Sequence, residues 1–450
     1  MHRFDETAEQ LTEWAVEWVR DRLALDPVPL DQRATKAELE ALAPNLIREA
    51  PRQPREVIEQ YTEILAPRVL SSDSPRFLSF IPSAPTKASC LFDMVVSASA
   101  LNGTSWLEAA GAIHAENQVL AVLAELAGLP PAAGGCFVSG GSAGNLSALA
   151  VARDVARHRR GDRARMAIVC SEQVHSSVTS TANLLDCDLI DVPAPGGRLN
   201  GDSVAAVAAG LDDPTLVCAV VATAGTTNAG IVDDLAGVSE VARRYDWWFH
   251  VDGAYGGAGL LSRMVRDRFV GIEHADSFVV DPHKWLFSPL DCCALLYRNP
   301  QLAKGVHTQD ASYLDAIREA SDEWNPTDYA YHLSRRARGL ATWFSLAVNG
   351  ISAYRDAVDQ AIVHARWAAE RIGRSPELEL VHDPDLSIVM FRRRGWGIAD
   401  YRRWSDDLLE RGVGFVLPSS WEGEPVLRLA ILHPDTDELI LEEILSSLES

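Results

Sequence analysis

The pentapeptide Asp281-Pro-His-Lys-Trp285 contains the residue types best suited to catalysis in this chain. It follows the apolar run 277–280, which predicts a short buried strand. A lysine at the end of such a strand lies in a region of low dielectric, where the neutral amine is favoured over the ammonium. A neutral amine on Lys284 beside the imidazole of His283 suits formation of a Schiff base. The alternative is an ordinary loop lysine beside the core residue Trp285, since most lysines are solvated.

A glycine-rich turn, Ser139-Gly-Gly-Ser-Ala-Gly-Asn145, follows the apolar run 135–138 and precedes a helical pattern over 146–153. Glycine lets the backbone approach a ligand, and a helix N-terminus binds anions, so the turn predicts a phosphate cradle. An ordinary strand-to-helix turn is the alternative. The turn also matches the Gly-x-Ser-x-Gly pattern of α/β-hydrolases, with Ser142 as nucleophile and a late histidine such as His433. That hypothesis leaves the other strand-end residues without roles.

Asp252 is a candidate acid, because it follows the apolar run 247–251 and precedes the mostly small residues Gly253-Ala-Tyr-Gly-Gly257. A carboxylate at the end of a buried strand requires a cationic partner, and a pyridinium nitrogen would serve. An aspartate that caps a turn is the alternative. Lys284 lies one strand-to-strand crossover further along (284 minus 252 is 32). We therefore expect both side chains at neighbouring strand ends, facing one cleft.

His175 and Thr223 each follow a further predicted strand. The imidazole of His175 is suited to stacking on the face of a flat ring, although a lone histidine is more often structural. Thr223 is suited to donating a hydrogen bond to a ring substituent. With Ser142, Asp252 and Lys284, these residues form a candidate site spread over much of the chain.

Five predicted strands position these side chains, and helical stretches separate them. Such alternation predicts right-handed crossovers and a mostly parallel sheet, whose ligands bind at the carboxyl ends of the strands. The predicted strands are 135–138, 166–170, 216–222, 247–251 and 278–280.

Three regions are expected along the chain. Residues 1–86 predict amphipathic helices, with Leu11, Trp14 and Trp18 at helical spacing, and they are expected to pack on a second subunit. Residues 87–341 form the large α/β domain. Residues 342–450 mix helices and strands and predict a smaller α/β domain.

Composition excludes several classes of protein. The net charge of -22 over 450 residues argues against a nucleic-acid-binding protein. The seven cysteines include no Cys-x-x-Cys pair, so neither a disulfide framework nor a metal site is expected. The acidic N-terminus lacks the features of a signal peptide, and no apolar run is long enough to span a membrane. A cytoplasmic location is the resulting expectation.

The order Ser142, His175, Thr223, Asp252, Lys284 resembles that of the group II pyridoxal-phosphate-dependent amino-acid decarboxylases, of the aromatic-amino-acid and glutamate decarboxylase type. The resemblance covers nearly the whole chain. It implies fold type I, with a mostly parallel seven-stranded sheet covered by helices on both faces, an N-terminal helical segment, a small C-terminal α/β domain and an obligate homodimer. The segments that carry it are Ser74-Pro-Arg-Phe77, Ser139-Gly-Gly-Ser142, His175-Ser-Ser177, Ala222-Thr-Ala-Gly-Thr-Thr227, His250-Val-Asp-Gly-Ala-Tyr255 and Pro282-His-Lys-Trp285.

The resemblance also implies a role for each matching residue. Lys284 would bind pyridoxal 5'-phosphate covalently, Asp252 would pair with the ring nitrogen, and Ala254 and His175 would lie against the two ring faces. Tyr313 would protonate the substrate carbon, and its presence with His175 favours an amine over an aldehyde product. The residues expected at the phosphate are Gly141, Ser142, Ser277 and His283; those expected near the substrate are Phe80, Pro82, Ser83 and Thr104; Arg335 matches a family arginine beyond the loop of Tyr313.

The implied reaction is decarboxylation of an L-amino acid to its amine and carbon dioxide. Thr104 stands where aromatic decarboxylases carry phenylalanine, Phe80 where they carry tyrosine, and Asp281 where asparagine is common. An aromatic or bulky hydrophobic substrate is expected first, with an acidic or aliphatic one as the alternative. Another fold type I reaction, that of an aminotransferase, a lyase or an aldehyde synthase, is a further alternative.

Overall fold

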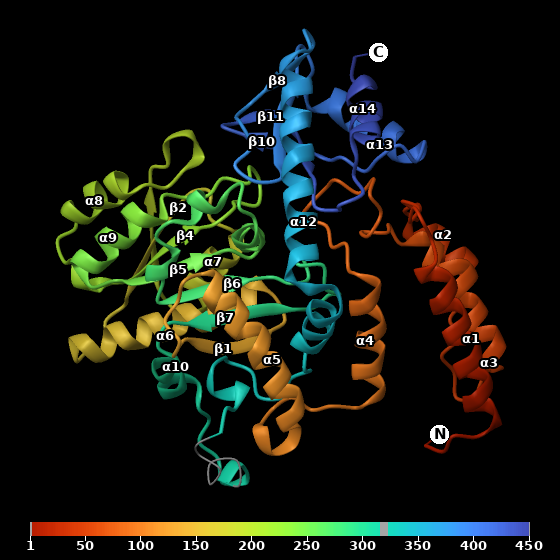
Figure 1. Ribbon diagram of the computed structural model, residues 1–450, viewed down its shortest axis with the longest axis horizontal. Helices are drawn as coiled ribbons and strands as arrows, with labels where there is room; N and C mark the ends of the chain where they lie inside the picture. Colours follow the sequence, from red (N-terminus) through yellow and green to blue (C-terminus); the bar gives the residue numbers. More distant parts are fainter. Residues whose placement is uncertain (1, 316–322, 450) are drawn as a thin grey trace.

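The computed structural model describes residues 2–315 and 323–449, apart from the side chain of Tyr313 (Figure 1). Its strands are β1 (Gly134–Val138), β2 (Ala167–Ser171), β3 (Asp188–Val192), β4 (Val217–Thr223), β5 (Trp248–Asp252), β6 (Ser277–Val280), β7 (Cys293–Tyr297), β8 (Leu378–Leu380), β9 (Ile388–Arg393), β10 (Pro418–Trp421) and β11 (Glu424–Ala430). Its helices are α1 (Glu6–Leu23), α2 (Lys36–Leu42), α3 (Pro54–Glu59), α4 (Lys87–Ala98), α5 (Trp106–Leu126), α6 (Gly141–Arg160), α7 (Ser176–Leu184), α8 (Gly201–Ala209), α9 (Leu235–Tyr245), α10 (Pro300–His307), α12 (Gly339–Gly373), α13 (Ile398–Glu410) and α14 (Glu438–Ser446).

The large sheet has seven strands in the order β1-β7-β6-β5-β4-β2-β3. Only β7 runs against the others, because it pairs antiparallel with both β1 and β6. The expected mostly parallel seven-stranded sheet is therefore confirmed. Each of the five predicted strands is present within two residues of its predicted limits, and β3 and β7 complete the sheet.

Both faces of the large sheet are covered, which explains the apolar runs of its strands. Successive side chains of β5 point to opposite faces: Trp248 packs in one apolar cluster with residues of α6, and Phe249 packs in another with residues of α5 and α9. Because β5 alternates in this way, Trp248, His250 and Asp252 share the face that α6 covers.

A second, antiparallel sheet of order β10-β11-β9-β8 lies in the C-terminal region, with α13 and α14. Helix α12 is 35 residues long and runs from the large domain to this sheet (Figure 1). The predicted boundary between residues 341 and 342 falls inside α12, which begins at Gly339. The three predicted domain limits stay predictions.

The N-terminal helices α1, α2 and α3 stand beside the rest of the chain (Figure 1). None of them contains a buried residue. α1 and α3 contact each other through Arg55, which lies 5.0 Å from the ring centroid of Trp14, and Trp18 of α1 forms an edge-to-face pair with Tyr61 just after α3. We call residues 6–59 the N-terminal arm.

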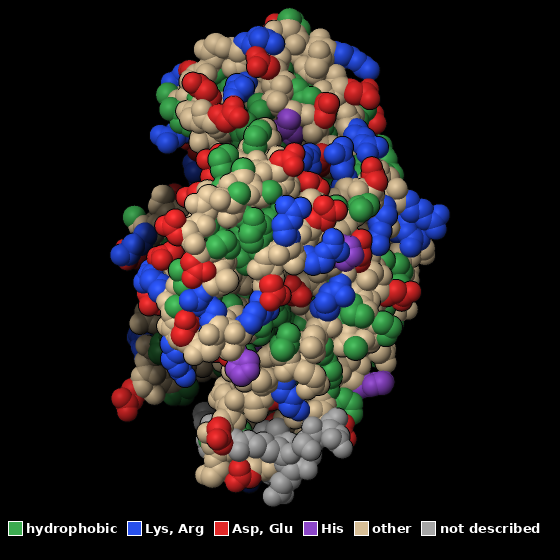
Figure 2. Space-filling view, turned by 90° about the vertical axis from the view of Figure 1, so that its left-hand side faces the viewer, with side chains coloured by type: hydrophobic (Ala, Val, Ile, Leu, Met, Phe, Trp, Pro, Cys, Tyr) green, Lys and Arg blue, Asp and Glu red, His purple; other side chains and the backbone are tan. Residues whose placement is uncertain are grey.

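The molecular surface carries charges of both signs. Figure 2 shows Lys and Arg side chains interspersed with Asp and Glu over the face that it presents. None of the described helices combines the length and the apolar character needed to cross a lipid bilayer.

Candidate active site

A cavity of about 240 Å³ lies at the carboxyl ends of the parallel strands of the large sheet. Eight of the predicted cofactor-binding residues line it, although they come from turns spread over more than 140 positions of the sequence. These residues are Gly141, Ser142, His175, Thr223, Asp252, Ala254, His283 and Lys284. Its other lining residues are Ser139, Gly140, Asn145, Gly225, Thr227, Tyr255, Asp281 and Leu290.

The amine of Lys284 forms an ion pair in this cavity, with Nζ 2.8 Å from Oδ2 of Asp281. Burial, the largest single influence, acts to lower the pKa of Lys284, but the carboxylates of Asp281 and Asp252 and the thiol of Cys293 raise it, and the net pKa lies above its ordinary value. The expectation of a neutral amine is therefore wrong for the chain as it stands. A neutral amine follows from desolvation alone, whereas the carboxylate three residues before Lys284 favours the ammonium.

Replacing Asp281 with asparagine is expected to lower the pKa of Lys284, because the charge that favours the ammonium is removed. The amine then becomes neutral at a lower pH, by about one unit or more for loss of a contacting opposite charge. Modification of Lys284 by an amine-specific reagent, followed by peptide mass spectrometry across pH in the cofactor-free chain, measures this midpoint. An unchanged midpoint would show that Asp281 does not hold the charge of Lys284.

Asp252 is a buried carboxylate that receives hydrogen bonds from neutral groups. Its Oδ2 accepts from Nδ2 of Asn145 at 2.8 Å, and its Oδ1 accepts from the backbone N–H of Ala254 at 3.0 Å. Within residues 2–315 and 323–449, no lysine or arginine forms an ion pair with it. A buried carboxylate of this kind fits a cationic ring nitrogen in the cavity.

The N-terminus of α6 is suited to the anion binding that the glycine-rich turn predicts. Gly140 caps the helix without a side-chain hydrogen bond, so the first backbone N–H groups face the cavity end without a competing cap. A Cβ at Gly141 would lie 3.0 Å from Cβ of Ala254 and 3.4 Å from Oδ2 of Asp281. The close approach of these segments explains the glycine and leaves the helix end open to a phosphate.

Ser277 is a correction to the sequence analysis. It lies at the first position of β6, fully buried, whereas the cavity lies at the other end of that strand. Its Oγ contacts Nε1 of Trp248 and Nδ1 of His250, both at 2.7 Å. The predicted phosphate contact of Ser277 is therefore wrong, because the serine lies at the wrong end of the strand.

Of the predicted substrate-binding residues, one lines a cavity beside the site and three do not. Phe80 and His175 line a neighbouring cavity of about 400 Å³. Pro82, Ser83 and Thr104 are buried and line neither cavity; Ser83 Oγ donates to the backbone oxygen of Ser288. Their substrate contacts stay predictions. The side chain of Tyr313 lies outside the described part of the chain, so its role also stays a prediction.

Two functional candidates escaped the sequence analysis. Asn145 lies within the quoted glycine-rich turn, one helical turn into α6, and contacts Asp252. Arg428 lies inside the apolar strand β11, where an arginine is unusual, and it lines the second cavity. Its guanidinium donates to the backbone oxygens of Thr227 and Asn228, and burial lowers its pKa to about 10.

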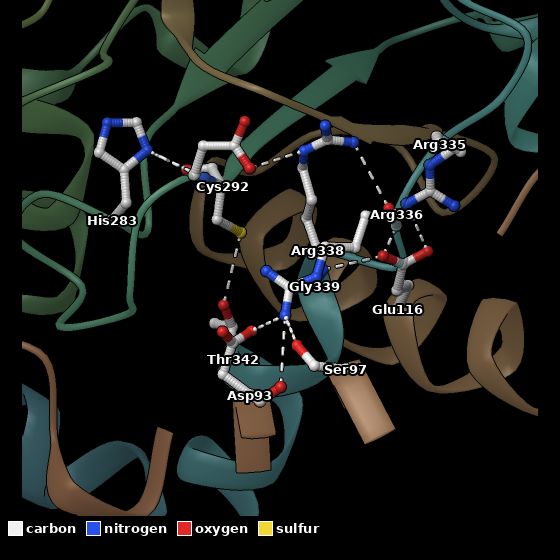
Figure 3. A network of polar contacts seen from close by, with 11 residues as sticks. Asp93, Ser97, Glu116, His283, Cys292, Arg335, Arg336, Arg338, Gly339 and Thr342 are labelled. Atoms are coloured by element: carbon white, nitrogen blue, oxygen red, sulfur yellow. Dashed lines mark hydrogen bonds and ion pairs between the residues drawn. The ribbon is translucent and has the colours of Figure 1, made fainter. Parts of the chain in front are cut away.

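A polar network connects the segment after Lys284 to the helices around it (Figure 3). At its centre Arg335 and Glu116 form a fully buried ion pair, with Nη2 2.6 and 2.7 Å from the two carboxylate oxygens. Glu116 also accepts from the backbone N–H of Gly339. Nearby, Nε of Arg338 contacts Oδ1 of Asp291 at 2.9 Å. This contact links the start of α12 to the segment that leads into β7.

Replacing Glu116 with glutamine is expected to destabilise the chain by about 3–5 kcal/mol, because it leaves the buried charge of Arg335 uncompensated. Denaturant unfolding of this variant beside the exposed-pair control Glu40→Gln measures the loss. A loss below about 1 kcal/mol, which is typical of surface pairs, would show that the charge of Arg335 does not depend on Glu116.

Comparison with known proteins identifies the family. The family model for the pyridoxal-dependent decarboxylase conserved domain matches residues 37–394. The chain is 31% identical to the aromatic-L-amino-acid decarboxylase of Bacillus atrophaeus over 401 residues, which cover 85% of this chain and 82% of that protein. It is 32% identical to the L-2,4-diaminobutyrate decarboxylase of Rhizobium meliloti over 378 residues, which cover 79% and 73% of the two chains.

Solved structures show the same fold. The crystal structure of Oryza sativa TDC with PLP and tryptamine matches with a TM-score of 0.89 at 24% identity, over 100% of this chain and 98% of that chain. The cavity itself fits the cofactor, because it combines an open helix N-terminus, a buried carboxylate that forms no ion pair with any described residue, and a lysine amine. The chain therefore belongs to the pyridoxal-dependent decarboxylases, and it is a carboxy-lyase that uses pyridoxal 5'-phosphate.

Proposed function

We propose that this enzyme converts an aromatic L-amino acid to the corresponding amine and carbon dioxide. The observation that carries the proposal is the position of Phe80, a residue that is 61% exposed and lines the second cavity beside His175. Val174, Leu417 and Pro418 add apolar surface to that cavity. An aromatic side chain entering it would exchange water for these groups. The aromatic-L-amino-acid decarboxylase of Bacillus atrophaeus, a relative at 31% identity, supports this choice.

The bound cofactor supplies an electron sink for the carbanion left when carbon dioxide departs. The protein's part is to hold protons and orient groups. Asp252 would keep the proton on the ring nitrogen, His175 would lie against the ring, and the N-terminus of α6 would hold the phosphate. Lys284 would carry the cofactor and release the product amine. We further propose Tyr313 as the general acid at the substrate carbon.

Arg428 supports a second candidate, an amino acid with an acidic side chain. Its guanidinium is buried beside the second cavity, and among the described residues no carboxylate forms an ion pair with it. A carboxylate entering the cavity would satisfy this charge, which backbone oxygens now solvate only in part. The two candidates therefore differ in which residue of the same cavity selects the substrate.

The test is a substrate panel with matched variants. Purified enzyme with pyridoxal phosphate is given L-phenylalanine, L-tyrosine, L-tryptophan, L-dopa, L-aspartate, L-glutamate and L-2,4-diaminobutyrate, and carbon dioxide, amine and aldehyde are followed together. Under the aromatic proposal Phe80→Ala lowers kcat/KM for the preferred substrate by about 10-fold or more. Preference for an acidic substrate, abolished by Arg428→Gln and retained in part by Arg428→Lys, would establish the second candidate instead.

We also propose that the enzyme is a homodimer in the cytoplasm. The helices of the N-terminal arm, which contain no buried residue, support a second copy as their packing partner, whereas Val28 and Leu30 between α1 and α2 are buried in their own chain. The apolar side chains of Leu91, Met94 and Val95 on α4 and of Val348 on α12 are exposed as well. All seven cysteines are free, which supports a reducing compartment. Light scattering of the purified protein measures the oligomeric state.

A further inference from the structure

Asn145 is the meeting point of two functional residues. Its Nδ2 donates to Oδ2 of Asp252 at 2.8 Å and to Oγ of Ser177 at 2.9 Å. The hydroxyl of Ser177 lies 2.8 Å from Nδ1 of His175. A single buried amide, 1% exposed, therefore bridges the residue expected at the ring nitrogen and the residue expected against the ring.

The chemistry of these groups fixes the direction of every hydrogen bond around Asn145. A carboxylate only accepts, so the amide nitrogen of Asn145 must face Asp252 and its oxygen must face the opposite way. That oxygen lies 2.9 Å from Nε2 of His250, which therefore carries a proton. Burial, opposed only in part by the charge of Asp252, lowers the pKa of His250 to about 4, so the ring is neutral and its Nδ1 is an acceptor.

The hydrogen-bond directions can also be followed from Trp248, at the other end of this series of contacts. The indole N–H of Trp248 can only donate, and it donates to Oγ of Ser277 at 2.7 Å. The hydroxyl proton of Ser277 is then free to point at Nδ1 of His250, also 2.7 Å away. The Trp248 end is thus compatible with the arrangement that the Asp252 end requires, in which hydrogen bonds run one way from Trp248 to Asp252.

A branch of this series of hydrogen bonds reaches His175 through Ser177. The backbone N–H of Ser177 donates to Nδ1 of His175 at 3.2 Å, so that nitrogen carries no proton. Because Oγ of Ser177 already accepts from Asn145, its own proton points to the same Nδ1. The proton of the neutral His175 ring is consequently on Nε2.

We propose that Asn145, oriented by His250, is a positioning residue that keeps Asp252 in its charged, accepting form. Removing the donated hydrogen bond makes Asp252 more basic, and the proton of the cofactor ring nitrogen then moves more readily to the carboxylate. Ser277 and Trp248 act one and two steps further back by fixing the ring of His250. The inference rests on binding of pyridoxal phosphate in this cavity, and it is independent of which amino acid is the substrate.

The decisive comparison is His250→Gln against His250→Met. Glutamine can still donate to the oxygen of Asn145, whereas methionine, of similar length, cannot. Each full-length variant is loaded with pyridoxal phosphate labelled with ¹⁵N at the ring nitrogen, and the ¹⁵N chemical shift is followed across pH without substrate. Wild type and His250→Gln are expected to show the ¹⁵N shift of a protonated ring nitrogen, and His250→Met is expected to show a shift displaced toward that of the unprotonated ring at the same pH, because the proton's preference for the ring nitrogen falls by about one pKa unit, the value of one hydrogen bond to a charged group.

Equal titrations of wild type and His250→Met would overturn the proposal. So would equal shifts in His250→Gln and His250→Met, because they would show that only the shape of His250 matters. If His250→Met does not fold, Ser277→Ala removes a single oxygen from the same series of hydrogen bonds and is expected to displace the ¹⁵N chemical shift in the same direction, and an unchanged chemical shift would also overturn the proposal. Since no substrate is present, a wrong choice of substrate class cannot imitate either result.

Discussion

Replacing Lys284 with methionine is expected to abolish covalent attachment of the cofactor and to lower turnover by about 10³-fold or more, a loss typical of removing a group that takes part in the chemistry. Methionine keeps the unbranched length of the side chain but has no amine. The loss of the ion pair with Asp281 leaves a buried carboxylate in the variant, which is expected to take up a proton. Mass spectrometry after borohydride reduction reports attachment, and release of carbon dioxide reports turnover.

The matched control is Lys36→Met, at a lysine that is 87% exposed on α2. It is expected to retain wild-type attachment and turnover. If Lys284→Met instead carried the cofactor through a reducible bond, the attachment would be at another lysine, and the site assigned to this cavity would be wrong.

Replacing Asp252 with asparagine is expected to lower turnover by about 10²–10³-fold, with little change in the fold. The variant keeps the shape of the side chain, but its single amide oxygen can accept only one of the two hydrogen bonds, from Asn145 or from the N–H of Ala254. It loses the charge that would hold a proton on the ring nitrogen, so a charge that develops during the reaction loses its stabilisation. Steady-state kinetics gives turnover, and equilibrium dialysis gives cofactor affinity, which is expected to fall as well.

The exposed residue Asp212 provides the control, since Asp212→Asn removes the same charge far from the cavity end of the sheet. Turnover of Asp252→Asn within a few-fold of wild type would contradict the role of the carboxylate. Full cofactor affinity with lost turnover would show that the charge acts in the reaction alone.

Much of the candidate site was predictable because parallel strands bring their carboxyl ends to one edge. Asp252 and Lys284 follow apolar runs whose burial on both faces leaves a clear signal in the sequence. β3 gave no such signal, because it is an edge strand with exposed and half-buried residues at four of five positions. The reversed direction of β7 depends on pairing with β1, which is separated from it by about 150 residues and cannot be inferred from local pattern.

The polar partners were less predictable than the strands. The charge of Lys284 depends on the orientation of the Asp281 side chain. A spacing of three residues does not specify whether that side chain points toward Lys284. Ser277 was placed at the phosphate by the family resemblance alone, although it begins β6 and ligands of a parallel sheet bind at the carboxyl ends of the strands. The contact of Asn145 with Asp252 could not be predicted, because the sequence does not show which turn of α6 faces β5.

The N-terminal arm has a consequence for how this enzyme responds to dilution. Its helices bury no side chain in their own chain, so the second copy proposed above would cover their apolar surface and stabilise their order. The stabilisation that such association gives would depend on the logarithm of protein concentration. The stability of the large sheet does not depend on it in this way, because the sheet has a hydrophobic core within its own chain. The arm is therefore the part of the chain whose protease resistance should decline first as the enzyme is diluted.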